Sequence, residues 1–385
     1  MQPSITLYSG ILLLGAAHGA FLALALINVR TGNTVALRLL ALLTLTFAVD
    51  LAVNFLNVSG YLVLHPRLFF IESVSSFLYG PLTYFYVLAM TSREQWQFSA
   101  RQWMHFLPFL IAIVALIPFY KLSNETLIDM IYARVGVEDQ LGSWATVGLI
   151  VEALPRPLIS IYIILGIQRL IQHGHDIREH FSLIENISLN WLRNLLIAMG
   201  VLCILYIISL AFGGTGPVEN LLNIAMVVVV YTLGYMGLKQ PTIFTQRNEK
   251  RLSNATATEK PKYERSALDD ESSKMLLKVL QDLMTTEQPY LDSKLTLAQL
   301  ADQLRISSNY LSQIINQQTG SNFFDYINSH RVAAAKEILA DPARVRVGVL
   351  TIAMDSGFNS KSAFYTAFKH HAGLTPSQYR QSKLS

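Results

Sequence analysis

The 385-residue sequence has little charge and almost no cysteine. Charged residues make up 15% of the chain, whereas a soluble domain usually carries about 25%. Hydrophobic residues make up 52%, and the mean hydropathy is +0.36. A single soluble globule is therefore not expected. Because Cys203 is the only cysteine, a disulfide framework and a cysteine-based zinc site are both excluded.

Sequence patterns typical of catalysis are also missing. The chain shows no nucleophile–base pair, glycine-rich phosphate loop or paired metal motif, so we predict neither an enzyme nor a cofactor. One run of histidines and carboxylates offers suitable metal ligands. We expect that run in a loop beside a membrane, without a supporting second cluster, and therefore predict no metal site there. The run comprises His173, His175, Asp176, Glu179 and His180.

Basic residues are distributed unevenly along the chain. Residues 1–240 contain 12 Lys and Arg, and the much shorter stretch 241–385 contains 18. The two halves therefore belong to different physical environments. The first half contains seven apolar stretches of roughly 17–25 residues, long enough to cross a bilayer. They lie at about 5–28, 36–57, 68–90, 104–120, 144–166, 193–213 and 219–238.

The basic residues between these stretches predict an orientation, because cytoplasmic loops carry an excess of Lys and Arg. An outside N-terminus leaves only Arg67, Lys121 and Arg134 on the outer side. Seven spans then place the C-terminus in the cytoplasm of a bacterial cell, with the first 240 residues in its inner membrane. The inner side receives Arg30, Arg38, Arg93, Arg101, Arg169, Arg178, Arg193, Lys239, Arg247, Lys250 and Arg251.

Ionisable groups within the spans are functional candidates, because burying charge in hydrocarbon is costly. Most lie toward the outer side, as a polar cavity open to the outside would require. Two alternatives stay open: Glu152 and Arg156, four residues apart, pair in an internal network, or these groups are scattered interfacial residues. Pro155 and Pro157 interrupt the fifth span and permit a kink. The candidate ligand or switch residues are Asp50, Glu72, Glu152, Arg156, Glu219 and Asn223.

Residues 241–262 are polar, lack apolar periodicity and contain two prolines, which predicts a cytoplasmic linker. A helical lead-in follows over 263–289. Within it, the amphipathic run 274–283 has two open roles, a dimer contact or packing onto the domain that follows.

Residues 290–385 show the pattern of two helix-turn-helix units. Thr296 and Gln299 form a capping box for a helix over 295–304, and Ser307 caps a second helix that ends at Gly320. The pattern recurs with a helix over 349–356 and another capped by Ser360.

A helix over 322–340 joins the two units, and a rod of 19 residues is roughly 28 Å long. This length would let one chain place two helices in adjacent major grooves, which are about 34 Å apart. Residues 305–385 carry nine Lys and Arg against four Asp and Glu, a balance suited to phosphate.

Two sequence segments carry a family resemblance. One runs from Phe323 to Arg331 (FFDYINSHR), and the other from Ile352 to Arg380, with Gly357-Phe358, Gly373 and Thr375-Pro376 as its fixed points. Together they resemble the AraC/XylS transcription-regulator domain over about 290–382. Tyr263, Ser266, Leu268 and Tyr290-Leu291-Asp292 resemble the lead-in found in members fused to a multi-span membrane sensor. Residues 1–240 resemble only that general architecture.

This resemblance implies sequence-specific binding of double-stranded promoter DNA and cooperation with RNA polymerase. The family's base-contacting positions correspond to Asn309, Ser312, Gln313, Lys361, Ser362 and Thr366. Asn and Gln can pair with adenine, and Lys can reach guanine. Ser307, Ser308 and Ser360 would hold phosphates at helix N-termini. Arg331 is expected to brace the fold through a carboxylate such as Asp355, while Phe358, Phe364 and Phe368 form core.

The sequence therefore predicts an all-α protein with a seven-helix membrane bundle and a cytoplasmic double helix-turn-helix domain. We expect a membrane-embedded transcription regulator that responds to an extracytoplasmic or membrane signal, with homodimerisation contributing to DNA affinity. In an alternative, the spans only anchor the chain, and a partner membrane protein controls the DNA-binding domain.

Overall fold

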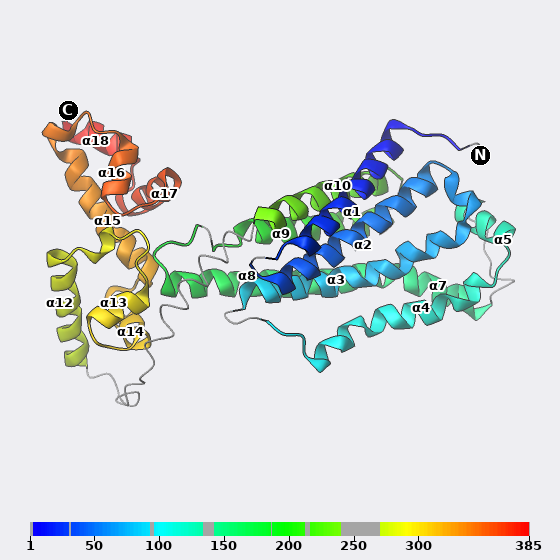
Figure 1. Cartoon of the computed structure of the whole chain (residues 1–385), viewed down its shortest axis with the longest axis horizontal. Helices are drawn as coiled ribbons and strands as arrows, with labels where there is room; N and C mark the ends of the chain where they lie inside the picture. Colours follow the sequence, from blue (N-terminus) through cyan, green and yellow to red (C-terminus); the bar gives the residue numbers. More distant parts are fainter. Residues whose placement is uncertain are drawn as a thin grey trace. The chain divides into compact units, whose positions relative to one another are not determined.

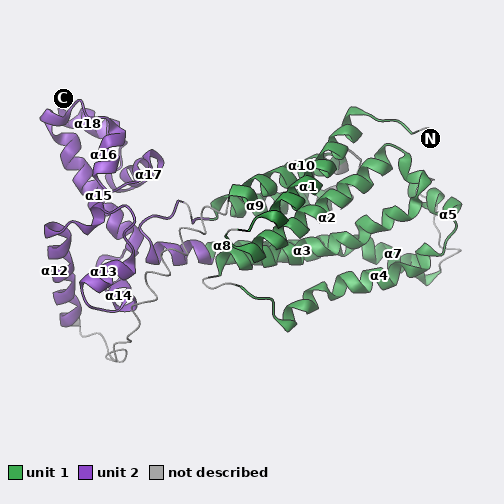
Figure 2. Cartoon of the chain, viewed as in Figure 1, with its two compact units in different colours: residues 1–171, 189–254 green, residues 172–188, 255–385 purple. Residues whose placement is uncertain are grey.

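The computed structural model describes residues 3–30, 32–92, 96–133, 142–185, 187–211, 216–239 and 270–384. The described part is helical and contains no β-strand, apart from an isolated bridge between Phe181 and Thr296. The chain divides into two compact units, coloured separately in Figure 2. Unit 1 comprises residues 1–171 and 189–254, and unit 2 comprises residues 172–188 and 255–385. The linker predicted at 241–262 lies outside the described residues.

Unit 1 is a bundle of long helices (Figure 1). One hydrophobic core lies mainly among the N-terminal helices and the last helices of the bundle, and a second lies among α3, α4, α5 and α7. The helices are α1 (Leu7–Asn28), α2 (Thr34–Val58), α3 (Phe69–Thr91), α4 (Leu107–Tyr120), α5 (Asn124–Ile128), α7 (Ser143–Ala153), α8 (Pro155–His180), α9 (Asn190–Ala211) and α10 (Gly216–Lys239).

Within the described ranges, six helical segments are long and apolar enough to cross a membrane. The seven-span count is therefore not confirmed. The predicted span at 68–90 does form a helix, α3, but this segment is not among the six. Its Glu72, serines and tyrosines make it more polar, and much of it is buried against other helices. The six are Leu7–Asn28, Thr34–Val58, Ala100–Tyr120, Ser143–His180, Asn190–Ile208 and Asn220–Lys239.

The expectation of a loop at His173–His180 was wrong. The helix α8 begins at Pro155 and continues to His180, well past the end of the predicted span at 166. The preceding helix, α7, ends at Ala153, so the helix break falls at Leu154, beside the two prolines. Proline is well tolerated at a first helical position because its missing N–H has no partner there.

The helices of unit 2 begin and end close to the predicted residues because capping signals are local. Thr296 and Gln299 form the predicted capping box, and Ser307 and Ser360 accept hydrogen bonds from backbone N–H groups of the helices that follow. The helices are α12 (Asp270–Thr286), α13 (Leu297–Gln303), α14 (Ser308–Thr319), α15 (Phe323–Ala340), α16 (Val349–Asp355), α17 (Lys361–Ala372) and α18 (Pro376–Leu384).

The helix α15 contributes to two separate hydrophobic cores. Figure 1 shows it between α13 and α14 on one side and α16 and α18 on the other. Its first half contributes Phe323 and Ile327 to the core of the first helix-turn-helix unit, and its second half contributes Ala335 and Leu339 to the second. Phe358, Phe364 and Phe368 lie in this second core, which confirms their predicted role.

Gly357 makes the turn between α16 and α17. Its φ is +85°, and a Cβ atom there would lie 2.9 Å from the Cα of Leu291. Both the left-handed backbone and the close approach of another chain segment require glycine.

The helix α12 packs onto the first helix-turn-helix unit. Leu280 and Met284 are buried in that core, while Met275 and Val279 on the same helix are exposed. Packing onto the domain that follows is therefore confirmed for this helix, and a dimer contact through its exposed side chains stays a prediction.

Candidate nucleic-acid interface and membrane-domain cavity

The second helix of each helix-turn-helix unit carries the predicted base-contacting residues. These helices are α14 and α17, and each begins at a serine whose Oγ accepts a backbone N–H. Ser307 Oγ lies 3.2 Å from the Tyr310 nitrogen, and Ser360 Oγ lies 3.1 Å from the Ala363 nitrogen. The caps satisfy helix N–H groups that otherwise have no backbone partner.

Most of the predicted DNA-contacting side chains are accessible. The exposed ones are Asn309, Gln313, Lys361, Ser362 and Thr366, while Ser307, Ser308, Ser312 and Ser360 are half-buried. Lys361 extends over the ring of Tyr365, with Nζ 5.4 Å from the ring centroid. The structure thus places all nine residues on α14, α17 or their N-caps, and their contacts with DNA stay a prediction.

Two glutamates from the segment 172–188 contact these helices within unit 2. Ser312 Oγ and Asn316 Nδ2 each donate to Glu179 Oε2 at 3.0 Å. Ser360 Oγ donates to Glu185 Oε1 at 2.7 Å. Sequence reasoning missed these contacts because the partners are 133–175 residues apart. One sequence feature could have indicated them: Glu179 and Glu185 are acidic, although their segment was expected on the inner side, where basic residues predominate.

A network around Arg331 holds the same segment against the domain. Ser182 is buried, and its Oγ donates to the Leu295 carbonyl at 2.6 Å. Arg331 Nη2 donates to Ser182 Oγ at 3.1 Å, and Nη1 donates to the Ser182 carbonyl at 3.3 Å. The antiparallel bridge between Phe181 and Thr296 adds a backbone contact beside this network.

Arg331 does brace the fold, but the predicted carboxylate partner was wrong. Its Nε donates to the Tyr290 carbonyl at 2.7 Å, and its Nη2 donates to the Asp292 carbonyl at 2.8 Å. No hydrogen bond or ion pair joins Arg331 to Asp355 in the described structure. Burial lowers the pKa of Arg331 to about 10, an effect that Asp292 partly opposes, so the guanidinium stays charged at neutral pH.

Comparison with known proteins agrees with this geometry. A family model described as a helix-turn-helix domain matches residues 300–382. An uncharacterised HTH-type transcriptional regulator of Bacillus subtilis, YtdP, is 36% identical over 94 residues, covering 24% of this chain and 12% of the relative. The melibiose operon regulatory protein of Escherichia coli is 30% identical over 90 residues, covering 23% of this chain and 29% of the relative.

The C-terminal domain is an AraC-type helix-turn-helix domain. Among solved structures, the chain is similar to the C-terminal domain of the response regulator yesN from Fusobacterium nucleatum. The two share 31% identity over 29% of this chain and 99% of that one, with a TM-score of 0.24. Because this chain spans less than a third of the length of the curated relatives named above, the resemblance concerns this domain.

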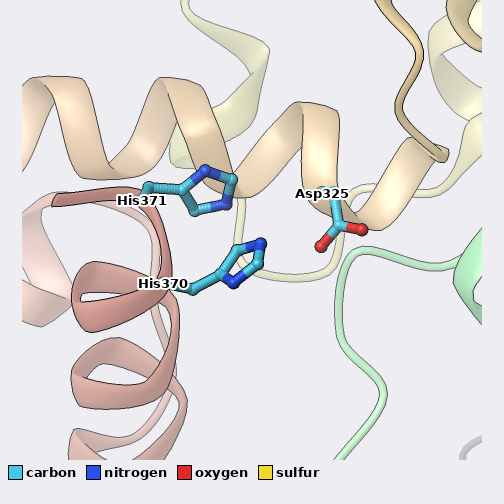
Figure 3. A group of neighbouring side chains, drawn as sticks. All are labelled: Asp325, His370 and His371. Atoms are coloured by element: carbon cyan, nitrogen blue, oxygen red, sulfur yellow. The ribbon is translucent and has the colours of Figure 1, made fainter. Parts of the chain in front are cut away.

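The AraC-type domain also brings together two histidines and a carboxylate that sequence reasoning missed. Asp325 at the start of α15 faces His370 and His371 at the end of α17 (Figure 3). Their ligand atoms lie within 4.8 Å of one another, and the three are suitable metal ligands. Asp325 Oδ2 already accepts from Asn322 Nδ2 at 2.9 Å. Burial, His370 and Lys336 together lower the pKa of His371, with Asp325 acting in the opposite direction, so the environment disfavours added positive charge.

Unit 1 contains a cavity of about 830 Å³ with mixed walls. Phe47, Phe119 and Met199 are among its apolar lining residues. Of the six predicted ligand or switch residues, the structure brings four to this cavity, namely Glu72, Glu152, Arg156 and Asn223. Glu219 lies in α10, but its side chain is outside the described residues.

Asn223 and Asp50, two of the predicted residues in unit 1, differ in their hydrogen bonds and in their relation to the cavity. Asn223 Nδ2 donates to Tyr8 Oη at 3.1 Å and to Asn54 Oδ1 at 3.3 Å. Asp50 does not line the cavity. It is buried, and its Oδ1 accepts from Ser75 Oγ at 2.5 Å while its Oδ2 has no hydrogen-bond partner. Buried polar atoms usually have partners, so this oxygen is an exception within unit 1.

The alternative in which the Glu152 carboxylate pairs with Arg156 was wrong. Arg156 Nη1 instead donates to the backbone carbonyl of Glu152, and Nη2 donates to Tyr206 Oη at 2.7 Å. The cause is the helix break, since Glu152 belongs to α7 and Arg156 to α8. The four-residue spacing therefore does not place the two side chains on one continuous helical face.

Proposed function

We propose that this protein is a membrane-embedded transcription regulator of a bacterial cytoplasmic membrane. Its AraC-type domain binds specific double-stranded DNA in the cytoplasm, and a signal received by unit 1 controls that binding. Promoter DNA, the lipid bilayer and RNA polymerase are the partners that this function requires. Two DNA-binding domains would act together in a homodimer.

The arrangement of α14 and α17 is the observation that carries the DNA-binding part of the proposal. Each helix begins at a serine cap and presents exposed polar side chains in its first two turns. The helix α15 that joins the two units contributes to both cores, so it can fix the spacing of α14 and α17. Its 18 residues span roughly 27 Å, a length suited to neighbouring major grooves.

The surface of unit 1 supports the membrane part. Large apolar side chains remain exposed on the long helices, among them Leu14 at 67%, Phe21 at 65% and Val114 at 62%. A soluble protein rarely exposes so extensive an apolar surface, whereas lipid favours it. The cavity of about 830 Å³ lies within this unit and has room for a small molecule.

A selection of DNA duplexes tests the proposed function. Full-length protein in lipid nanodiscs is mixed with a library of randomised duplexes, and the bound DNA is sequenced. We expect the wild type to enrich a defined motif and the Gln313→Ala/Lys361→Ala variant to lose that enrichment. Each side chain that contacts a base contributes about 1–3 kcal/mol to discrimination.

The matched control is the Gln381→Ala/Lys383→Ala variant, which makes the same two replacements at exposed positions of α18. It should select the wild-type motif. Enrichment of an unchanged motif by the Gln313→Ala/Lys361→Ala variant would contradict the assignment of α14 and α17 as base-contacting helices.

A further inference from the structure

We propose that the segment 172–188, which contains the end of α8, inhibits DNA binding by contacting α14 and α17, the two recognition helices. This inference rests on the proposed function. The segment places Glu179 against α14 and Glu185 against the N-terminus of α17. It therefore reaches both helix-turn-helix units of the AraC-type domain at once.

The donors used by these glutamates are the donors that DNA would need. Ser312 is a predicted base-contacting residue, and Ser360 is a predicted phosphate contact at a helix N-terminus. In the structure both hydroxyl groups donate to carboxylate oxygens, at 3.0 and 2.7 Å. A hydroxyl has one proton to donate, so it cannot serve a glutamate and a DNA acceptor together.

The charge of the segment opposes DNA in the same places. A carboxylate beside a helix N-terminus occupies the position that suits a phosphate, because the N–H groups and helix dipole favour negative charge there. Two carboxylates on the recognition helices would also repel the phosphates of an approaching duplex. The acidic segment thus competes with DNA phosphates for α14 and α17.

Independent contacts show that the segment is docked on the domain. Ser182 is 3% exposed and exchanges hydrogen bonds with Leu295 and Arg331. Arg178 lies over the ring of Phe324, with 5.9 Å from its guanidinium carbon to the ring centroid. These anchors hold the two glutamates in register with α14 and α17.

Helix continuity gives unit 1 a means of releasing the inhibition. The helix α8 runs unbroken from Pro155 to His180, so Arg156 near its start and Glu179 near its end belong to the same helix. Arg156 lines the cavity of unit 1. A ligand that rotates or shifts α8 would withdraw Glu179 from Ser312 and Asn316, and the recognition helices would become available to DNA.

Charge removal in the full-length protein tests the proposal. Wild type and Glu179→Gln/Glu185→Gln are each incorporated in nanodiscs and used in the duplex selection. The affinity of both proteins is then measured for the duplexes that either one enriches. We expect the variant to bind roughly tenfold more tightly or better, since three hydrogen bonds to charged acceptors are weakened. The control Glu271→Gln/Glu287→Gln changes the net charge equally at exposed positions and should leave the affinity within twofold of wild type.

A crosslinking arm tests docking without DNA. On a Cys203→Ser background, Glu179→Cys and Asn316→Cys are joined by a short bismaleimide, and duplex added beforehand should reduce the yield. A crosslink with unchanged DNA affinity in Glu179→Gln/Glu185→Gln would overturn the inhibition, as would an absent crosslink. If no protein enriches any duplex, the proposed function itself fails, and the crosslink still reports whether the segment docks.

Discussion

Two arginines, one in each unit, differ in how completely the protein uses their hydrogen-bond donors. Arg331 in unit 2 is 2% exposed and donates from all three nitrogens to backbone carbonyls and to side-chain oxygens of Ser182 and Asn328. Arg156 in unit 1 is half-buried, donates to one backbone carbonyl and one tyrosine hydroxyl, and faces a cavity.

The difference separates a structural role from a candidate functional one. A buried arginine whose donors are all satisfied stabilises one arrangement of the chain segments around it. An arginine at the wall of a cavity, with only some of its N–H groups hydrogen-bonded, still has donor capacity for a ligand. We therefore expect substitution of Arg331 to affect mainly folding, and substitution of Arg156 to affect mainly the response to a signal.

The largest effect is expected for Arg331→Met. Methionine keeps a long side chain but has no N–H to donate, so the carbonyls of Tyr290 and Asp292 lose their donor. Each buried acceptor left unpaired costs about 1–3 kcal/mol. We expect unit 2 to lose roughly 3 kcal/mol or more of unfolding free energy. Hydrogen exchange of peptides from α15, measured by mass spectrometry on the full-length protein, reports this loss.

Lys336→Met on the same helix is the control for charge removal. Lys336 is half-buried, and its Nζ lies 5.8 Å from the centroid of the Tyr379 ring. Its exchange rates should stay near those of wild type. If Arg331→Met exchanged no faster than Lys336→Met, the hydrogen bonds of Arg331 would not stabilise the domain as described.

Arg156→Met should leave the folding of both units nearly unchanged while abolishing the change in transcription between growth conditions. The reason is that this guanidinium donates two hydrogen bonds and lies over the ring of Tyr206, fewer contacts than Arg331 makes, and lines the cavity. A reporter driven by the selected DNA motif measures the response, and Arg169→Met provides a control outside the set of cavity-lining residues. A response that survives both Arg156→Met and Glu72→Gln would favour the alternative in which a partner membrane protein controls the domain.

The stability of unit 2 should fall as the pH is lowered below about 6.5, the usual pKa of histidine. Burial lowers the pKa of His330, which stacks on Tyr290 with ring centroids 5.6 Å apart. Because the pKa of His330 is lower in the folded state, the unfolded chain binds the proton more readily. The stability present above the pKa of the unfolded state is therefore lost as the pH falls through the pKa of the folded state. Hydrogen exchange of α15, corrected for intrinsic rates, should show this trend in wild type and a weaker one in His330→Gln.

The smallest effect is expected from metal ions. The group of Asp325, His370 and His371 offers three ligands, but Lys336 contributes to the lowering of the His371 pKa, and Asp325 accepts from Asn322. We therefore expect neither zinc nor a chelator to change the hydrogen exchange of α15 and α17. Protection that rises with zinc and disappears in Asp325→Asn would show that these residues do hold a metal ion.

The sequence predicted the local structure of unit 2 well because its signals are local. Thr296, Ser307 and Ser360 each cap a helix within a few residues of their own position, and Gly320 and Gly373 end helices with positive φ. The family resemblance added only an expectation of which helices contact DNA, and the family model and the relatives support the DNA-binding class of the domain.

Contacts between distant segments could not be predicted in the same way. The partners of Arg331 include Ser182, which is 149 residues away, and the expected partner Asp355 was wrong. In unit 1 the spacing of Glu152 and Arg156 suggested an ion pair, but the break at Leu154 separates their helices. The cavity was anticipated from polar residues within apolar stretches, although Asp50 lies outside its wall.

Crosslinking of the full-length protein to chromosomal DNA in cells tests directly whether the membrane-embedded protein binds specific DNA sites. Bound fragments are sequenced for the wild type and for Gln313→Ala/Lys361→Ala, with both proteins measured in the membrane fraction. We expect discrete sites for the wild type that disappear in the variant, while both proteins remain in the membrane. Absence of enriched sites for the wild type under every growth condition, or identical sites for both proteins, would contradict this expectation.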